Sequence, residues 1–174
     1  MQGQYALGLL PAQGSRARDK LVSMIERLRA EHDTDSFEPH VTLIVVSNAS
    51  EAEVRWKTQQ LTEKARPFQI SLGELGSNGT YFQMLFAKAL LSEELHQLNE
   101  QAQELFGKRE LYFPHLSLVY GDLLPHDVEL LKSLVENELG DPLSTEFEVT
   151  GIELWHTDAE VNHWRHLETY PFSR

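Results

Sequence analysis

One five-residue pattern occurs twice in this sequence, and the repetition constrains the fold more than any other feature. Residues 39–43 (Pro-His-Val-Thr-Leu) and 114–118 (Pro-His-Leu-Ser-Leu) share proline, histidine, an apolar residue, a hydroxyl residue and leucine in the same order. Proline makes up about 5% of average sequences, so fewer than one Pro-His pair is expected by chance among the eight histidines. The repetition therefore predicts two equivalent segments with related chemistry.

Each repeat is typical of the beginning of a β-strand. Successive side chains of a strand point to opposite faces, so His40 shares a face with Thr42, and His115 shares a face with Ser117. The apolar residues of each repeat then point into the core. If the two strands are neighbours, two imidazoles and two hydroxyls converge on one cleft.

Such a set of side chains suits the chemistry of a phosphodiester. Histidine titrates near pH 6.5, so one ring can take a proton from water while the other gives a proton to the leaving oxygen. The two hydroxyls would help to hold the charge on the non-bridging oxygens. This scheme requires no metal and no cofactor. His163 and His166 are three residues apart, so in a strand they would point to opposite faces, and together with His156 they do not predict a metal site.

The remaining pattern predicts helices interleaved with about seven strands. Apolar alternation and β-branched runs predict strands over these ranges: 4–10, 40–46, 68–72, 81–86, 115–120, 147–155 and 164–170. Polar caps before apolar residues at helical spacing predict helices over these ranges: 15–31, 50–66, 92–107 and a fourth that ends at 140–142. Gly151 is expected to form a bulge within its strand. Because several strands form hairpins, we expect an α+β protein with antiparallel sheets and outer helices.

Composition limits the classes of function. The chain has 174 residues, no cysteine and a formal charge of -12. Without cysteine there is no thiol nucleophile, zinc–thiolate site, iron–sulfur cluster or disulfide. The negative charge opposes tight binding to duplex nucleic acid, although it permits a small anion in a local pocket. With neither a signal sequence nor a membrane span, we expect a cytoplasmic protein that has no membrane partner. We also expect a monomer that forms one domain over 1–174.

Beyond the two motifs, the chain resembles the two-histidine (2H) phosphoesterase superfamily, and within it the cyclic phosphodiesterase branch known from plants and yeast. The similar segments follow the same order along the chain: 5–11, 37–42, 79–83, 112–120, and Trp164 ahead of 170–172. The resemblance implies two pseudo-symmetric lobes of antiparallel sheet with outer helices around a central cleft. It also implies hydrolysis of ADP-ribose 1″,2″-cyclic phosphate or of a nucleoside 2′,3′-cyclic phosphate, the latter to the 2′-phosphate.

The same resemblance implies roles for individual residues. His40 and His115 occupy the family's catalytic positions, and Thr42 and Ser117 occupy those that contact phosphate. By analogy with related enzymes, His115 is expected to activate water and His40 to protonate the departing 3′ or 1″ oxygen. Tyr120 matches an aromatic residue that lines the cleft in the plant-like branch. Since Tyr120 lies three positions after Ser117, it reaches the cleft only if the strand bends or ends beside it.

Two other interpretations fit the same residues. One is an enzyme that processes RNA ends or joins 2′–5′ linkages, against which the acidic composition and the lack of a basic stripe argue. The other is a nucleotide-binding module of the same fold without turnover, against which the intact motifs argue. Phe82, Trp155 and Trp164 could stack on a nucleobase, although aromatic residues in strands more often belong to the core. The sequence assigns no lysine or arginine to the cleft.

Overall fold

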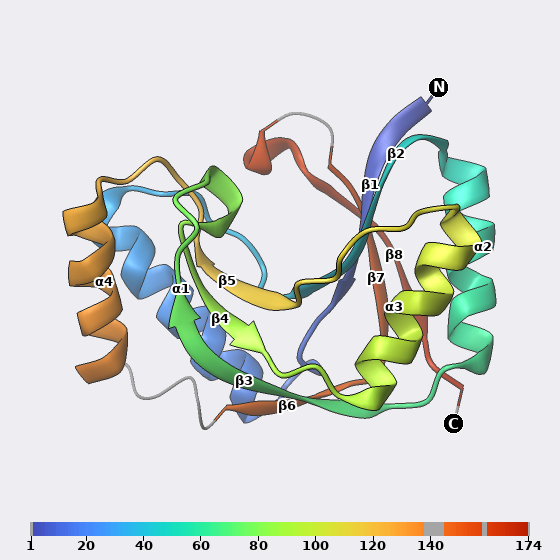
Figure 1. Cartoon of the computed structure of the whole chain (residues 1–174), viewed down its shortest axis with the longest axis horizontal. Helices are drawn as coiled ribbons and strands as arrows, with labels where there is room; N and C mark the ends of the chain where they lie inside the picture. The colour runs from blue at the N-terminus through green and yellow to red at the C-terminus, as the bar shows by residue number, and fades with distance from the viewer. Residues whose placement is uncertain (1, 138–144, 158–159, 174) are drawn as a thin grey trace.

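Eight strands of the chain form one curled antiparallel sheet, shown in the computed structural model of Figure 1, which describes residues 2–137, 145–157 and 160–173. The strands are β1 Gln2–Leu9, β2 Val41–Ser50, β3 Phe68–Gly76, β4 Leu85–Ala89, β5 His115–Val119, β6 Glu146–Val149, β7 Gly151–His156 and β8 Arg165–Pro171. The helices are α1 Arg16–His32, α2 Glu51–Lys64, α3 Glu93–Phe106 and α4 Pro125–Asn137, with 3₁₀ turns η1 Tyr81–Gln83 and η3 Val161–His163. The predicted α+β class with antiparallel strands is confirmed.

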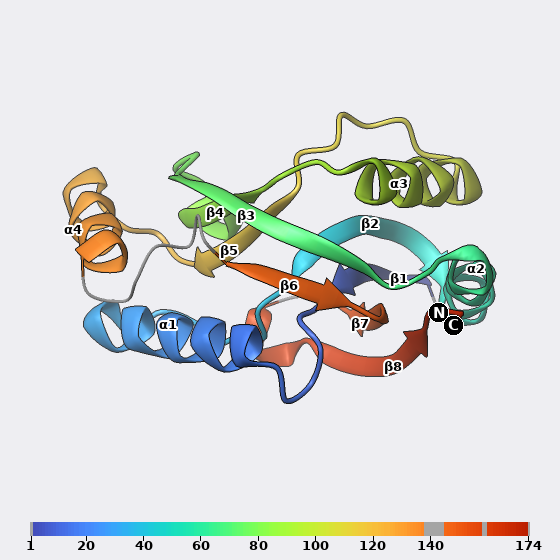
Figure 2. The same ribbon diagram turned by 90° about the horizontal axis from the view of Figure 1, so that it is seen from below.

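Two halves of the same plan make up the sheet, whose order is β6-β3-β4-β5-β2-β1-β7-β8. In each half the strand at the centre of the whole sheet, β2 or β5, carries a histidine motif. Each central strand pairs with the strand that precedes it in the chain, β1 through α1 or β4 through α3. Helices α1 and α4 lie at one end of the sheet and α2 and α3 at the other, as Figures 1 and 2 show. The expected pseudo-symmetric arrangement is therefore confirmed.

The helices begin at the predicted polar caps. The side chains of Ser15, Ser50 and Ser92 each accept a hydrogen bond from a backbone N–H three residues further on, which satisfies a donor that the helix leaves unpaired. Helix α3 ends at Gly107, whose φ of 67° suits glycine. The end expected for the fourth helix, at 140–142, lies outside the described residues. No described helix is both long and apolar enough to cross a membrane.

The two faces of β1 have different surroundings: one packs in the core and the other lines cavities. Tyr5, Leu7 and Leu9 are almost completely buried in the hydrophobic core, as their alternation predicted. Burial of a leucine side chain stabilises the fold by roughly 1.5–3 kcal/mol. Ala6 and Gly8, which alternate with them, line cavities on the other face. One face of the sheet thus holds the molecule together and leaves the other for a site.

The prediction of one strand over 147–155 with a bulge at Gly151 is wrong. The chain leaves β6, which pairs with β3, and enters β7, which pairs with β1 in the other half. At this break a Cβ atom on Gly151 would lie 2.5 Å from the carbonyl oxygen of Tyr170, so only glycine allows the two backbones to approach. The buried positions change from 147 and 149 to 152 and 154 across the break, so the shift in alternation that a bulge was expected to cause marks the change of partner instead.

The strand predicted over 81–86 begins only at Leu85. Residues 81–83 form η1, which is closed by a hydrogen bond of 3.0 Å from the Gln83 N–H to the Thr80 carbonyl oxygen. The other differences between predicted and observed strand bounds are smaller. For example, β2 continues to Ser50 because it remains paired with β1, where Gln2 lies opposite Ser50. The turn η1 places Phe82 over the site instead of in the core.

Candidate active site

Strands β2 and β5 meet at the centre of the sheet and bring the two motifs together. They pair antiparallel, with Val41 opposite Leu116, and both of these side chains are fully buried. In this register the histidine of each motif lies level with the hydroxyl residue of the other, on the face away from the core. The two histidines therefore lie diagonally across the centre of the sheet.

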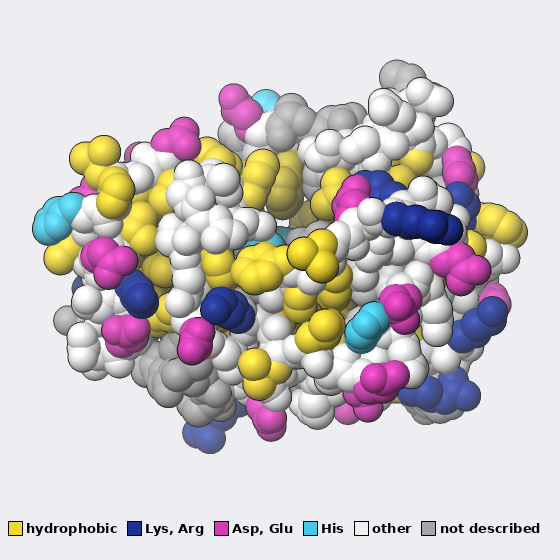
Figure 3. All heavy atoms as spheres, viewed as in Figure 1, with side chains coloured by type: hydrophobic (Ala, Val, Ile, Leu, Met, Phe, Trp, Pro, Cys, Tyr) yellow, Lys and Arg dark blue, Asp and Glu magenta, His cyan; other side chains and the backbone are white. Residues whose placement is uncertain are grey.

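A single cavity of about 240 Å³, called here the motif cavity, contains side chains from both motifs. Its wall includes His40, Thr42, His115, Ser117 and Tyr120. Figure 3 shows histidine atoms in a hollow at the centre of the visible face, beside hydrophobic side chains. The fold thus brings together all five site residues named from the sequence.

Both imidazoles are held in the same way. The Nδ1–H of His40 donates to the carbonyl oxygen of Glu38 over 2.7 Å, and that of His115 donates to the carbonyl oxygen of Phe113 over 2.9 Å. A carbonyl oxygen can only accept, so Nδ1 carries the proton and Nε2 of the neutral ring is a free base. Each motif therefore presents Nε2 for proton transfer.

The two rings have different neighbours. The ring of His115 lies 5.2 Å from the rings of Phe86 and Phe113, measured between centroids. His40 lies at the edge of Phe37, with centroids 6.5 Å apart, and its Nε2 is 3.4 Å from the hydroxyl of Tyr120. A polar partner is therefore near the reactive nitrogen of His40, whereas aromatic rings surround His115.

The two hydroxyls also differ. Ser117 is buried, and its hydroxyl donates to the carbonyl oxygen of Phe82 over 2.9 Å. The hydroxyl of Thr42 has no hydrogen bond to any of the described residues, and its backbone carbonyl accepts one of 3.1 Å from Tyr112. Thr42 can therefore donate to a ligand directly, whereas Ser117 must exchange one acceptor for another.

Tyr120 reaches the motif cavity because β5 ends at Val119, before it. The following Gly121 has a φ of 151°, a conformation that favours glycine, and the chain turns away there. The ring of Tyr120 stacks on Phe37 with centroids 3.8 Å apart. Burial raises the pKa of Tyr120, so its hydroxyl stays protonated. The strand thus ends beside Tyr120, which was the condition for this residue to reach the cleft.

Burial lowers the pKa of both histidines. Removing the His40 ring from water disfavours its charged form; the hydrogen bond to the Glu38 carbonyl opposes the shift, and the nearby His115 adds to it. Burial also lowers the pKa of His115, against its bond to Phe113. Both rings therefore favour the neutral state, and a negative charge between them would favour protonation of one.

Cations do not contribute to the wall of the motif cavity among the described residues: neither lysine nor arginine lines it. An anion bound there must be held by hydroxyl donors and by a protonated imidazole. The described residues also contain no group of three or more His, Asp and Glu side chains placed to hold a metal ion. His156, His163 and His166 therefore form no such group.

Some residues of the wall could not be found from the motifs. Thr157, at the end of β7, and Trp164, after η3, line the motif cavity together with Phe82 of η1. The ring of Phe82 stacks on Trp164, with centroids 5.8 Å apart. Phe82 and Trp164 carry an aromatic signal in the sequence, whereas Thr157 carries none. Trp155 lies outside this cavity, in a neighbouring one that also contacts His40.

Comparisons with known proteins agree with this geometry. The sequence profile of the cyclic phosphodiesterase-like protein family matches residues 1–170. Among curated proteins, no sequence matches the chain significantly. The fold is similar to that of E. coli LigT complexed with 3′-AMP, with a TM-score of 0.68 at 13% identity and 100% of each chain covered.

Two further solved structures share the fold. A protein of Thermus thermophilus matches with a TM-score of 0.67 at 17% identity, covering 99% of this chain and 98% of that one. Usb1 of Kluyveromyces marxianus matches with a TM-score of 0.52 at 15% identity, covering 98% of each chain. At such low identities the likeness establishes the fold alone.

Proposed function

Because this chain belongs to the cyclic phosphodiesterase-like protein family, we propose that it hydrolyses a cyclic ribose phosphate by acid–base catalysis between His40 and His115, without a metal ion. The observation that carries the proposal is the motif cavity, in which both imidazoles and both motif hydroxyls form one wall. The family is one of phosphoesterases, and the cavity supplies what such a reaction needs: a base, an acid and two hydrogen-bond donors.

The proposed reaction has a single displacement at phosphorus. Nε2 of neutral His115 takes a proton from water while the water oxygen forms a bond to phosphorus. The bond from phosphorus to the 3′ or 1″ ring oxygen breaks, and Nε2–H of protonated His40 gives its proton to that oxygen. The product is a monoester with one hydroxyl restored. Exchange of one proton with solvent returns both rings to their starting states.

Thr42 and Ser117 would donate to the two non-bridging oxygens. These oxygens carry the charge that shifts as the ring opens, and donors fixed in a partly buried site stabilise that charge more than water does. The hydroxyl of Thr42 is available, and that of Ser117 would leave the Phe82 carbonyl for the phosphate. Fixed donors of this kind replace the arginine and lysine that the described wall lacks.

The assignment of His40 as the acid and His115 as the base follows the analogy with related enzymes. Burial lowers the pKa of both rings. At His40 the carboxylate of Glu38 favours the protonated form, and burial and the nearby His115 act more strongly in the opposite direction.

Structures of a relative with the same fold also support a nucleotide substrate. E. coli LigT has been crystallised with 3′-AMP, phosphate, NADP+ and ATP. A nucleoside phosphate or a phosphate-bearing dinucleotide is therefore a reasonable class of ligand for the cleft of this chain.

Phosphorus NMR tests the proposal. Purified protein is incubated in EDTA with nucleoside 2′,3′-cyclic phosphates and ADP-ribose 1″,2″-cyclic phosphate, and the spectrum reports which ester bond opens. We expect a monoester signal, at the 2′ position for nucleoside substrates, that is lost in His40→Ala and His115→Ala. His126→Ala is the matched control, because His126 is an exposed histidine on α4 outside the cavity. Normal turnover by either motif variant would exclude the mechanism.

Two other outcomes would identify the alternative functions. Turnover of an oligonucleotide with a cyclic end, but not of a cyclic mononucleotide, would indicate an RNA-end-processing enzyme or 2′–5′ ligase. Binding of a nucleoside 2′-phosphate without hydrolysis of any cyclic compound would indicate a nucleotide-binding module.

A further inference from the structure

The two halves of the sheet are joined by little backbone pairing. Strand β2 pairs with β1 from Val41 to Ser50, but among the described residues it pairs with β5 only where Val41 lies opposite Leu116. Strand β5 begins at His115, and Pro114 before it has no N–H that could extend the ladder. Other contacts must therefore help to fix the distance between the two motifs.

Two side chains from the second half bind backbone carbonyls of the first motif. The hydroxyl of Tyr112 donates to the carbonyl oxygen of Thr42 over 3.1 Å. The amide of Asn99 donates to the carbonyl oxygen of Leu43, the next residue, over 2.8 Å. The register of β2 against β1 skips Leu43, as at a β-bulge, and a buried carbonyl there requires another partner. Both donors lie between β4 and β5 in the chain, so they tie the second half of the sheet to the first.

Asn99 extends this contact into a chain of hydrogen bonds. Its Oδ1 accepts from Nε2 of Gln103 over 2.7 Å. Oε1 of Gln103 in turn accepts from the backbone N–H of Glu110 over 2.6 Å. Asn99 is only 4% exposed, and a buried network of satisfied polar groups makes its surroundings rigid. Asn99, Gln103 and Tyr112 are called here the bridge.

The bridge acts on the backbone that orients His115. Tyr112 immediately precedes Phe113, whose carbonyl oxygen accepts the Nδ1–H of His115 over 2.9 Å. Gln103 holds the same segment at Glu110. A displacement of residues 110–113 would therefore carry the reactive Nε2 of His115 with it.

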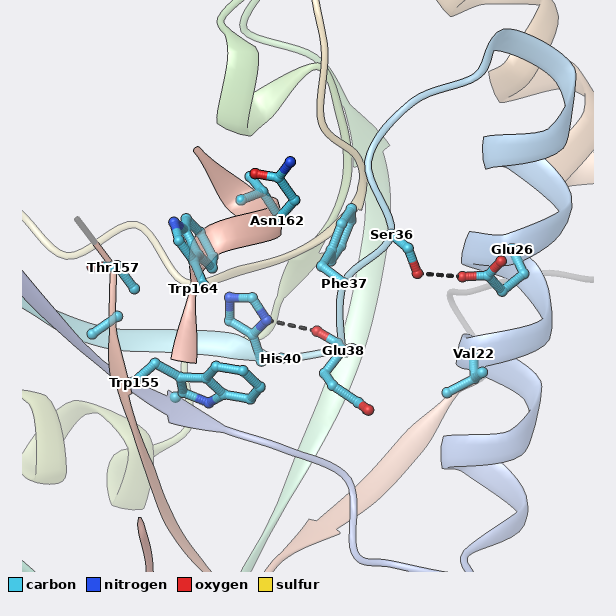
Figure 4. A pocket seen from close by; sticks show the side chains of 13 residues that line it. Val22, Glu26, Ser36, Phe37, Glu38, His40, Trp155, Thr157, Asn162 and Trp164 are labelled. Atoms are coloured by element: carbon cyan, nitrogen blue, oxygen red, sulfur yellow. Dashed lines mark hydrogen bonds between the residues drawn. The ribbon is translucent and has the colours of Figure 1, made fainter. Parts of the chain in front are cut away.

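The first motif has a comparable anchor within its own half. Figure 4 shows His40 bound through Nδ1 to the carbonyl oxygen of Glu38. In the same figure Ser36 binds Glu26 of α1, which ties that segment to a helix. The segment before His115 is tied instead to β2, the strand of the other motif. Loss of the bridge should therefore change the position of one motif relative to the other.

A cavity of about 160 Å³, called here the seam cavity, lies beside the bridge. Its wall includes all three bridge residues, residues 42–45 of β2, residues 110–113 and His115. Space next to a segment removes the close packing that would otherwise oppose a shift. On this side, therefore, the hydrogen bonds of the bridge hold residues 110–113 in place.

We infer that Asn99, Gln103 and Tyr112 are positioning residues, which hold the imidazoles of the two motifs at the separation that the reaction requires. The inference rests on the proposed function. The three side chains act through the motifs, since none of them is among the described residues of the motif cavity wall. Misplacement of a reacting group by about 1 Å can lower the rate about 10²-fold, so a small shift has a large effect.

Asn99→Leu and Tyr112→Phe test the inference by kinetics. Each variant fills the space of the original side chain and removes a donor to a carbonyl of the first motif. We expect kcat for a nucleoside 2′,3′-cyclic phosphate to fall about 10- to 10²-fold, with KM changed less than about twofold, because the cavity wall is intact. The double variant should lose less than the product of the two single losses, since both donors set one distance.

Thr58→Val is the matched control. Thr58 is fully buried in α2, and its hydroxyl donates to the carbonyl oxygen of Val54 over 2.8 Å, the same length as the bond from Asn99. It is absent from the described walls of the motif and seam cavities. Denaturant unfolding should show a loss of stability in this variant as in Asn99→Leu, whereas its kcat should not change. If both bridge variants keep the kcat of this control, the bridge only stabilises the fold and the inference is wrong.

The ¹⁵N signals of the imidazoles give a measurement that does not depend on turnover. The signals of His40 and His115 are identified by their loss in His40→Ala and His115→Ala. We expect the His115 signals to move in Asn99→Leu and in Tyr112→Phe and to stay in place in Thr58→Val. Unmoved His115 signals in both bridge variants would overturn the inference.

The outcomes separate this inference from the proposed function. If the unaltered protein hydrolyses no cyclic phosphate, the proposed function fails, and the imidazole signals still decide whether the bridge positions His115. If hydrolysis occurs but the bridge variants match Thr58→Val in kcat, only the inference fails.

Discussion

The two motif segments share one sequence pattern but have different surroundings. In both, the imidazole donates its Nδ1–H to the carbonyl two residues earlier, so the local sequence alone sets the direction of each ring. The surroundings come from distant parts of the chain. His40 faces Tyr120 and borders a second cavity, whereas His115 lies against Phe86 and Phe113. A repeated motif can thus place two equivalent groups, while the rest of the fold gives them different tasks.

The largest expected effect is the loss of either ring. If one histidine is the base and the other the acid, His40→Ala and His115→Ala should each lower kcat by about 10²–10⁴, because proton transfer contributes that much to rate. The double variant should be little worse than either single one, since the rings act as a unit. Steady-state kinetics at saturating substrate measures this. Independent, multiplying losses would mean that the two halves do not cooperate in one step.

Removal of the motif hydroxyls should distinguish the two halves more clearly than removal of the imidazoles. Thr42→Val keeps the shape of the side chain and removes a donor that has no partner among the described residues. We expect kcat to fall about 10²-fold, as for the loss of one donor to a developing anion, with unchanged stability. Denaturant unfolding alongside the kinetics would establish whether the fold is intact.

Ser117→Ala should behave differently, because its hydroxyl already donates to the Phe82 carbonyl. The variant should lose stability by roughly 1 kcal/mol, the net value of a hydrogen bond, and its kcat should fall less than that of Thr42→Val. A larger kinetic loss at Ser117, with no change in unfolding, would reverse the comparison.

A smaller effect is expected at Tyr120, which has contact with only one of the two rings. Tyr120→Phe keeps the stacking on Phe37 and removes the hydroxyl 3.4 Å from Nε2 of His40. A net hydrogen bond of about 0.5–1.5 kcal/mol corresponds to a change of roughly 2- to 12-fold in kcat/KM. A loss as large as that from removing an imidazole would instead make Tyr120 a proton donor or acceptor in the reaction.

Local geometry explains why the centre of the candidate site could be predicted. The positions of His40, Thr42, His115 and Ser117 follow from the alternation of side chains in a strand, which needs no knowledge of the rest of the fold. Only the pairing of β2 with β5 had to be assumed, and the sheet order provides it. The catalytic roles of these residues stay predictions.

The parts that the sequence did not predict depend on pairing between distant segments. The switch from β6 to β7 places Gly151 against Tyr170, and the apolar alternation carries no information about which strand lies alongside. Thr157 is an ordinary threonine in the sequence and becomes part of the wall only because β7 pairs with β1. The neighbouring cavity that contacts His40 and Trp155 likewise combines α1 with β7, which no local pattern connects.

The final test concerns the charge that the two halves share. Burial lowers the pKa of His40 and of His115 below the ordinary value of 6.5, so the free protein holds the one proton needed for catalysis only in more acidic solution. A form with one proton on the pair is most populated midway between the two apparent pKa values, and both lie below 6.5, so kcat/KM should peak below pH 6.5. A bound phosphodiester is negative and raises both pKa values, so the maximum of kcat should lie at higher pH than that of kcat/KM. Complete pH–rate profiles measure both maxima. If the two maxima coincide, the anion does not lie between the two rings; if kcat/KM peaks above pH 6.5, burial does not lower the pKa values of the free rings.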